Sequence, residues 1–142
     1  MWTDEQFDQY RKESTALETS MENILGDESL RSCVRSVCSN LRNNSYRFRV
    51  VIADATDFKI EDEHNVSFQI RRSDSILTIS VCEGWTNIYT KCISLRKWNL
   101  PDRFTDLDLL IDRAEHIFRY ASDTKTWIDK ANQIVKRVEG QG

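Results

Sequence analysis

The residues best suited to bind a metal ion are four cysteines and two histidines, and their spacing argues against a metal site. Cys33 and Cys38 are five positions apart in a segment with helical periodicity. At about 100° per residue their thiols point about 140° apart, so they cannot share one ion. Cys82 and Cys92 are expected on opposite faces of a hairpin. We therefore expect no metal and no cofactor, and the scattered cysteines favour reduced thiols.

Nucleophilic catalysis needs a nucleophile within reach of a base, and neither histidine lies in a local catalytic signature. His116 follows Asp112 by one helical turn, a spacing typical of a surface ion pair. His64 lies in an acidic segment. We therefore expect a protein without catalytic activity. A small enzyme with no local motif, built from His116 and acids from elsewhere in the fold, remains an alternative.

Charged residues are segregated along the chain, although its net charge is only −3. Residues 1–29 hold eight acids and two bases, residues 30–53 five bases and no acid, and residues 54–63 five acids and one base. Such a layout favours docking to a protein with a basic surface. The acidic residues expected to take part are Asp4, Asp8, Glu18, Glu22, Asp57, Glu61, Asp62 and Glu63.

One face of the predicted sheet carries bases, polar side chains and an aromatic ring. Clustered bases on strands, with a ring such as Tyr89, suit a phosphate backbone and a stacked base. The same composition also describes an ordinary solvated sheet face. A nucleic-acid-binding domain is therefore an alternative function, and its candidate residues are Arg47, Arg49, Gln69, Arg71, Tyr89 and Lys91.

Two helices are expected before the sheet, over residues 4–25 and 28–42. Thr3 and Gln6 fit a capping box at the start of the first helix. In both segments apolar residues recur at steps of three and four, which predicts one apolar face on each helix. Gly26 is expected to end the first helix.

Alternating apolar residues predict a four-stranded antiparallel meander. The first strand is expected over residues 46–53 and the other three between residues 66 and 92. The acidic stretch 54–63 is interpreted as a loop in which Phe58 and Ile60 add only a short edge pairing. The apolar face of this sheet must be covered, and the flanking helices are expected to cover it.

Two-residue loops set the expected register of the hairpins. A loop at Ser73-Asp74 would place Ile70 opposite Leu77. A loop at Gly84-Trp85 would place Val81 opposite Ile88, so that Ile88 and Cys92 continue the apolar face. Tyr89 and Lys91 would then lie on the polar face.

Two further helices are expected after the lone Pro101. Thr105 caps the first, and its apolar stripe extends to Ala121. Ser122-Asp123-Thr124 is expected to end this helix and to cap a last one, although a single continuous helix is the alternative, because the segment holds no glycine or proline. The apolar residues of that last helix are Trp127, Ile128, Ala131, Ile134, Val135 and Val138.

Together these predictions describe one α+β domain over residues 1–142, in the order αα-ββββ-αα, with helices mainly on one sheet face and a loose tail at 139–142. No stretch approaches the roughly 18 apolar residues of a membrane span, and the acidic N-terminus does not fit a secretory signal, so we expect a soluble cytoplasmic protein. We expect a macromolecule-binding protein of the inhibitor, immunity, chaperone or adaptor type. Another protein is its expected partner, with nucleic acid and a second copy as alternatives.

Overall fold

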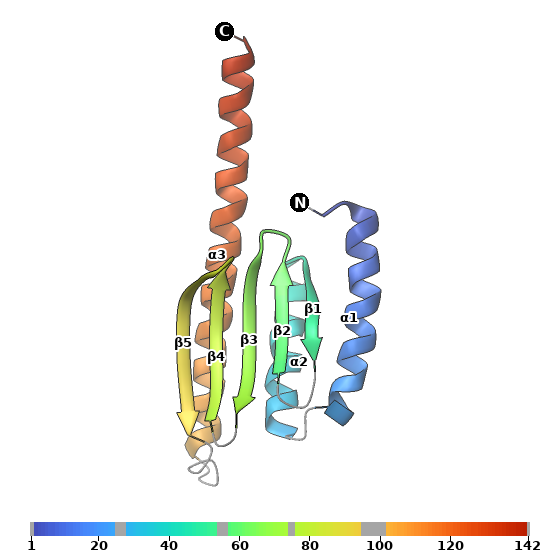
Figure 1. Cartoon of the computed structure of the whole chain (residues 1–142), viewed down its shortest axis with the longest axis vertical. Helices are drawn as coiled ribbons and strands as arrows, with labels where there is room; N and C mark the ends of the chain where they lie inside the picture. Colours follow the sequence, from blue (N-terminus) through green and yellow to red (C-terminus); the bar gives the residue numbers. More distant parts are fainter. Residues whose placement is uncertain (1, 25–27, 54–56, 74–75, 95–101, 142) are drawn as a thin grey trace.

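The computed structural model describes residues 2–24, 28–53, 57–73, 76–94 and 102–141. Two helices precede a five-stranded antiparallel sheet, and one long helix follows it (Figure 1). The expected α+β class and meander are confirmed, because the strands lie side by side in sequence order. The elements are α1 (Asp4–Ile24), α2 (Glu28–Asn43), β1 (Phe48–Ala53), β2 (Asp57–Asp62), β3 (Val66–Ser73), β4 (Ile76–Glu83), β5 (Thr86–Ser94) and α3 (Asp102–Gln141).

Among the described elements, α2 and α3 cover the same face of the sheet. Figure 1 looks onto the opposite face, hereafter the uncovered face, with these two helices behind the strands. The covered face and the two helices share one hydrophobic core. Its fully buried side chains include Phe58, Ile60, Phe68, Ile79 and Val81 from the sheet, Val34 and Leu41 from α2, and Phe118 from α3.

The first helix protects an edge of the sheet. α1 packs along β1, the edge strand, rather than over a sheet face (Figure 1). The buried Ser14 faces this strand, and its Oγ accepts a hydrogen bond of 2.8 Å from the backbone N–H of Val50. An edge strand with unpaired backbone groups invites association with another chain, so this contact blocks the β1 edge.

The segment expected to be an acidic loop contains a strand, so the sheet has five strands rather than four. β2 lies between β1 and β3, and its Phe58 and Ile60 are buried opposite Ile70 and Phe68. The prediction was wrong because the acidic composition was given more weight than the alternation of the two apolar side chains. In a strand, acids at alternate positions can face away from the core.

The hairpin of β3 and β4 has the expected faces in a different register. Ile70 lies opposite Ile79, so its predicted pairing with Leu77 is wrong. Ser73 pairs with Ile76, so the pairing of the two strands continues one residue further along β3 than expected. The partner of each residue therefore changes by two positions, and a shift of two keeps every side chain on its face because the period of a strand is two.

β5 presents the opposite face from the one predicted. The loop at Gly84-Trp85 is as expected, but beyond it Ile88 forms a bulge and Val81 pairs with Tyr89. A shift of one residue exchanges the two faces of the whole strand. The predicted pairing of Val81 with Ile88 is therefore wrong. Tyr89, Lys91 and Ile93 lie on the side of α3, and Thr90 and Cys92 lie on the uncovered face.

The predicted break between two C-terminal helices is wrong, because α3 is one helix of 40 residues. The polar residues at the expected break find partners without leaving the helix. Thr124 Oγ1 donates to the carbonyl of Tyr120 at 2.8 Å, and Thr126 Oγ1 donates to the carbonyl of Ser122 at 3.2 Å. The expected loose tail belongs to α3 as far as Gln141. Within the described residues, no helix combines the length and apolarity that crossing a membrane requires.

Candidate functional site

Arginines from the basic block neutralise several of the acidic candidates. The guanidinium group of Arg47 lies 2.6 Å from an oxygen of Asp4, and Nε of Arg49 lies 2.8 Å from one of Glu61. The blocks of opposite sign therefore meet in space, and part of the charge that is segregated along the sequence is paired in the fold. The pairs are Asp4 with Arg47, Glu18 with Arg42, and Glu61 with Arg49.

The other acidic candidates do not gather on one surface. Asp62 is buried, and its Oδ1 accepts hydrogen bonds of 2.9 Å from the backbone N–H groups of His64 and Val66, so this carboxylate holds the β2–β3 turn. Asp57 lies on the uncovered face, Asp8 is exposed on α1, Glu63 is half-buried after β2, and Glu22 belongs to α1 with a side chain outside the described residues.

The nucleic-acid candidates are divided between the two sheet faces. Arg49, Gln69 and Arg71 share the uncovered face, whereas the register of β5 places Tyr89 and Lys91 on the other. Arg47 precedes β1 and stacks on a ring of α1, with its guanidinium carbon 4.9 Å from the ring centre of Phe7. On the uncovered face, the carboxylate of Asp57 accepts a hydrogen bond of 2.7 Å from the side-chain amide of Gln69 and lies 3.5 Å from Nε of Arg71.

A pocket of about 340 Å³ lies where α1, the end of α2 and the start of β1 meet. Arg11, Arg42 and Arg47 line it together with the rings of Phe7 and Phe48. Such a lining suits an anionic ligand with an apolar part. Two of these arginines already pair with carboxylates of α1, however, so the positive charge of the pocket is largely satisfied within the chain.

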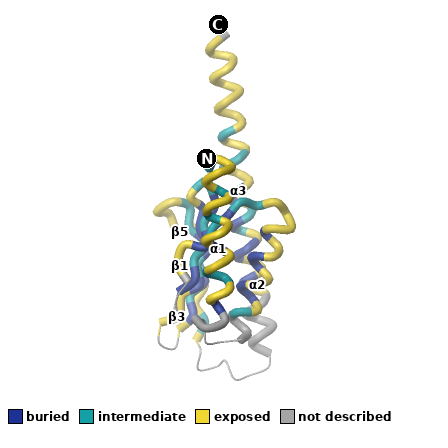
Figure 2. Tube along the Cα trace, turned by 90° about the vertical axis from the view of Figure 1, so that its right-hand side faces the viewer, coloured by how far each residue is buried: buried dark blue, intermediate teal, exposed yellow. Residues whose placement is uncertain are grey.

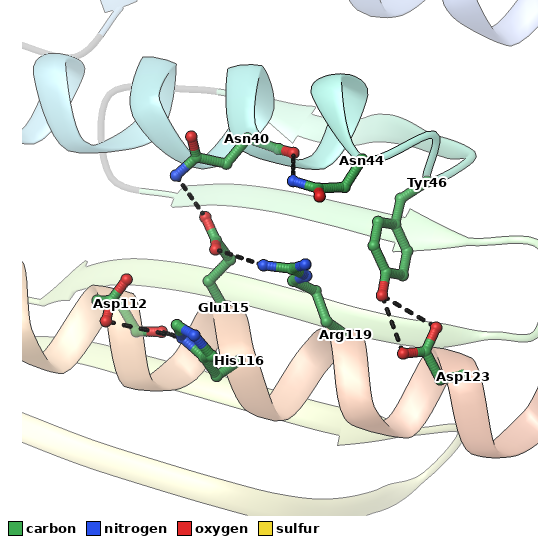
Figure 3. Close-up of polar contacts among 8 residues, drawn as sticks. All are labelled: Asn40, Asn44, Tyr46, Asp112, Glu115, His116, Arg119 and Asp123. Carbon is green, nitrogen blue, oxygen red and sulfur yellow. Dashed lines mark hydrogen bonds and ion pairs between the residues drawn. The ribbon is translucent and has the colours of Figure 1, made fainter.

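A group of polar contacts joins α3 to α2 and to the segment that follows α2 (Figure 3). Glu115 is buried. Its carboxylate accepts a hydrogen bond of 3.2 Å from the side-chain amide of Asn40 and lies 3.7 Å from the guanidinium group of Arg119. The hydroxyl of Tyr46 donates to both carboxylate oxygens of Asp123, at 2.9 and 3.0 Å. Burial raises the pKa of Tyr46. Buried polar groups need such partners, so these polar contacts fix the position of α3.

His116, the residue on which the enzyme alternative depends, is exposed beside these polar contacts. Its Nδ1 lies 2.8 Å from the carbonyl oxygen of Asp112 and 3.6 Å from a carboxylate oxygen of the same residue. Asp112, Glu115 and His116 bring their potential ligand atoms within 4.8 Å of one another. A cation there would compete with the partners that Glu115 already has, so these contacts account for the cluster without a ligand.

His64 makes a connection that the sequence did not predict. Its Nε2 lies 3.2 Å from Oγ1 of Thr126, and its Nδ1 lies 3.2 Å from Oδ2 of Asp129. The order hydroxyl, imidazole, carboxylate is that of a catalytic triad. A triad also needs donors for an oxyanion, and the N–H groups of His64 and Val66 are already bonded to Asp62. The arrangement fits a structural link better than a catalytic one.

Three contacts tie α3 down where it leaves the sheet, and we call them the exit contacts. Besides the bonds of Tyr46 and His64, Nζ of Lys125 lies 2.6 Å from a carboxylate oxygen of Glu83. That hydrogen bond raises the pKa of Lys125. The exit contacts join Tyr46 to Asp123, Glu83 to Lys125, and His64 to Asp129.

Beyond the exit contacts, α3 projects from the body of the molecule, and residues 131–140 are exposed (Figures 1 and 2). Trp127 is 72% exposed, Ile134 59% and Val138 64%. We call this apolar row the outer stripe. It begins beside the exit contacts with Tyr120 and Trp127 and continues beyond them with Ala131, Ile134 and Val138, and it is flanked by Ile128 and Val135.

The outer stripe faces away from the core. At about 100° per residue, its members lie about 100–180° around α3 from the buried Ala114 and Phe118, and about 140° on average. Sequence reasoning identified most of these residues as an apolar face and expected the helices to cover the sheet with such faces. The structure instead leaves this face exposed, because the side of α3 that packs on the sheet is the opposite one.

Comparisons of the chain with protein-family models, with curated proteins and with solved structures found no match. The molecule is an α+β protein with a meander sheet that α2 and α3 cover on one face, and the C-terminal part of α3 projects from the body. Its function must be argued from these features.

Proposed function

We propose that the protein is a non-catalytic binding protein that contacts another protein chain through the outer stripe of α3. The observation that carries the proposal is the exposure of an apolar row, interrupted only by Thr124, on a helix that extends beyond the body. Fully burying one large apolar side chain is worth about 1.5–3 kcal/mol. A contiguous exposed row of such side chains is a common mark of a protein interface.

The contact we propose is mainly apolar, in contrast to the charged docking expected from the sequence. The pairing of Glu18, Glu61 and Asp4 with arginines leaves fewer free carboxylates for a basic partner. An amphipathic helix that lays its apolar face into a groove or against another helix is a recurring mode of recognition. The outer stripe has the spacing that this mode uses.

Affinity capture with the tagged full chain tests this proposal. Ile134→Asp places a charge in the outer stripe, and Gln133→Asp places the same charge on the polar side of the same helix, at an exposed position. Lysate, with and without nuclease treatment, is passed over the wild type and both variants, and the retained proteins are quantified by mass spectrometry. We expect a retained protein to be lost at least tenfold from Ile134→Asp and kept by Gln133→Asp.

Equal capture by all three chains would contradict the proposal. Capture that disappears on nuclease treatment would favour the nucleic-acid alternative instead.

A further inference from the structure

We infer that the partner on the outer stripe is the same stripe of a second copy of the chain, in an antiparallel pair of helices. This inference rests on the proposed function and names the partner at that site. Three features carry it: the spacing of the stripe, its match to its own reversed order, and the residues on its two flanks.

The spacing is that of a coiled-coil seam. Successive seam positions are four and three residues apart in turn, which keeps one narrow face of a helix against one partner helix. Thr124 is the single polar member of the seam, and Tyr120 is 76% exposed at its inner end. The seam positions are Tyr120, Thr124, Trp127, Ala131, Ile134 and Val138.

The seam is complementary to itself when one copy is reversed. Centred near residue 129, an antiparallel pair places Trp127 opposite Ala131, so the largest side chain meets the smallest one twice. Tyr120 then lies opposite Val138 and Thr124 opposite Ile134, so the stripe overlaps its copy over about 27 Å of helix. Alternation of large and small side chains across facing positions allows close packing.

The flanks of the seam distinguish the antiparallel pair from a parallel one. One flank carries the apolar Ile128 and Val135, and the other carries Asp123, Lys130 and Arg137. In a parallel pair each flank faces the unlike flank, which would set apolar side chains beside charged ones. In an antiparallel pair like flanks meet, so Ile128 packs beside its own copy and Asp123 comes opposite Arg137. Lys130, between them, then lies near its own copy at the solvent-exposed edge of the pair.

The body of the molecule leaves room for this pair. The outer stripe lies on the side of α3 away from the sheet, and residues 131–140 are exposed throughout. The two bodies would therefore lie at opposite ends of the helix pair, each on the outer side of its own helix.

Sedimentation equilibrium of the purified full chain tests the inference. We expect a dimer with a dissociation constant on the order of micromolar. Ile134→Asp should weaken the dimer at least tenfold, while Gln133→Asp leaves it within a factor of two. A wild type that stays monomeric, or a dimer that Ile134→Asp does not weaken, would overturn the inference.

Disulfide trapping tests the direction of the helices, in a chain with the accessible native thiols removed by Cys82→Ser and Cys92→Ser. Ile128→Cys lies near the centre of the antiparallel pair and should crosslink to its own copy. Val138→Cys should not, because its copy lies at the far end. Crosslinking of Val138→Cys, as a parallel pair requires, would refute the antiparallel arrangement.

The two proposals fail separately. A monomeric wild type that still captures another protein through the outer stripe would remove the second copy and keep the proposed function. A chain that neither dimerises nor captures a protein through this stripe would remove both.

Discussion

Individual polar side chains fix the point at which α3 leaves the sheet. The hydroxyl of Tyr46, the imidazole of His64 and the carboxylate of Glu83 each reach a polar group on this helix. Sequence reasoning could not find these contacts, because their partners are more than 40 residues apart and nothing in local periodicity relates them. For the same reason it read His64 as part of an acidic loop.

Removal of the Tyr46 hydroxyl should destabilise the fold modestly. Tyr46→Phe deletes the hydrogen bond to Asp123 and leaves that carboxylate partly solvated, so we expect a loss of about 0.5–1.5 kcal/mol in the free energy of unfolding. Tyr120→Phe is the matched control, because its ring is exposed. Urea denaturation monitored by circular dichroism measures both. An equal effect of the two substitutions would argue against the exit contact.

The thiols report the register of β5. Cys92 is exposed on the uncovered face, whereas Cys33 and Cys38 are buried in the core. Burial raises the pKa of the Cys38 thiol, which disfavours its reactive thiolate. We expect a disulfide reagent to modify Cys92 first in the native protein, and Cys92→Ser to remove that fast phase. Persistence of the fast phase in Cys92→Ser would contradict this placement.

At the scale of the elements, periodicity predicted which residues of a helix or strand share an apolar face, but not what packs against that face. The alternation in β3 and β4 identified the covered face even though the register was displaced, because a shift of two preserves it. The bulge at Ile88 shifts the register of β5 by one residue, so the two faces of this strand are exchanged relative to the prediction. The apolar face around Trp127 and Ile134 was also recognised, but periodicity does not say what covers a face.

The projecting part of α3 should be separable from the stability of the body. Lys136→Pro removes a backbone hydrogen bond in this part and disrupts the helix around it. We expect roughly a tenth of the helical circular dichroism to be lost. The free energy of unfolding of the dilute chain should change by less than about 0.5 kcal/mol, because residues 131–140 are exposed. Lys136→Ala is the control, and a large loss of stability confined to the proline variant would show that the body depends on this segment.

For the whole molecule, pairing between charge blocks replaces the surface segregation that the sequence indicated. Composition along the chain predicted an acidic patch and a basic patch. The fold places Asp4 beside Arg47 and Glu61 beside Arg49, which brings the opposite signs together. Local composition could not foresee this, because it depends on where α1 packs and on a strand that was read as a loop.

Stability should fall in alkaline solution. The pKa of Cys38 is raised above its ordinary value of 9.0, and that of Tyr46 above 10.0, in both cases chiefly by burial. Both groups therefore keep their protons in the folded state while the unfolded chain releases them, so the free energy of unfolding decreases as pH rises above about 9. Urea denaturation between pH 7 and 10.5 checks this, and Cys38→Ala should flatten the decline.

The central claim is that the stripe of a second copy of the chain covers the outer stripe, and amide hydrogen exchange along α3 tests it most directly. In the concentrated wild-type chain we predict slower exchange at residues 127–138 than in Ile134→Asp, with equal exchange at residues 110–118, which pack on the body in both. Equally fast exchange of residues 127–138 in the two chains would mean that the stripe stays in solvent, and would contradict the account.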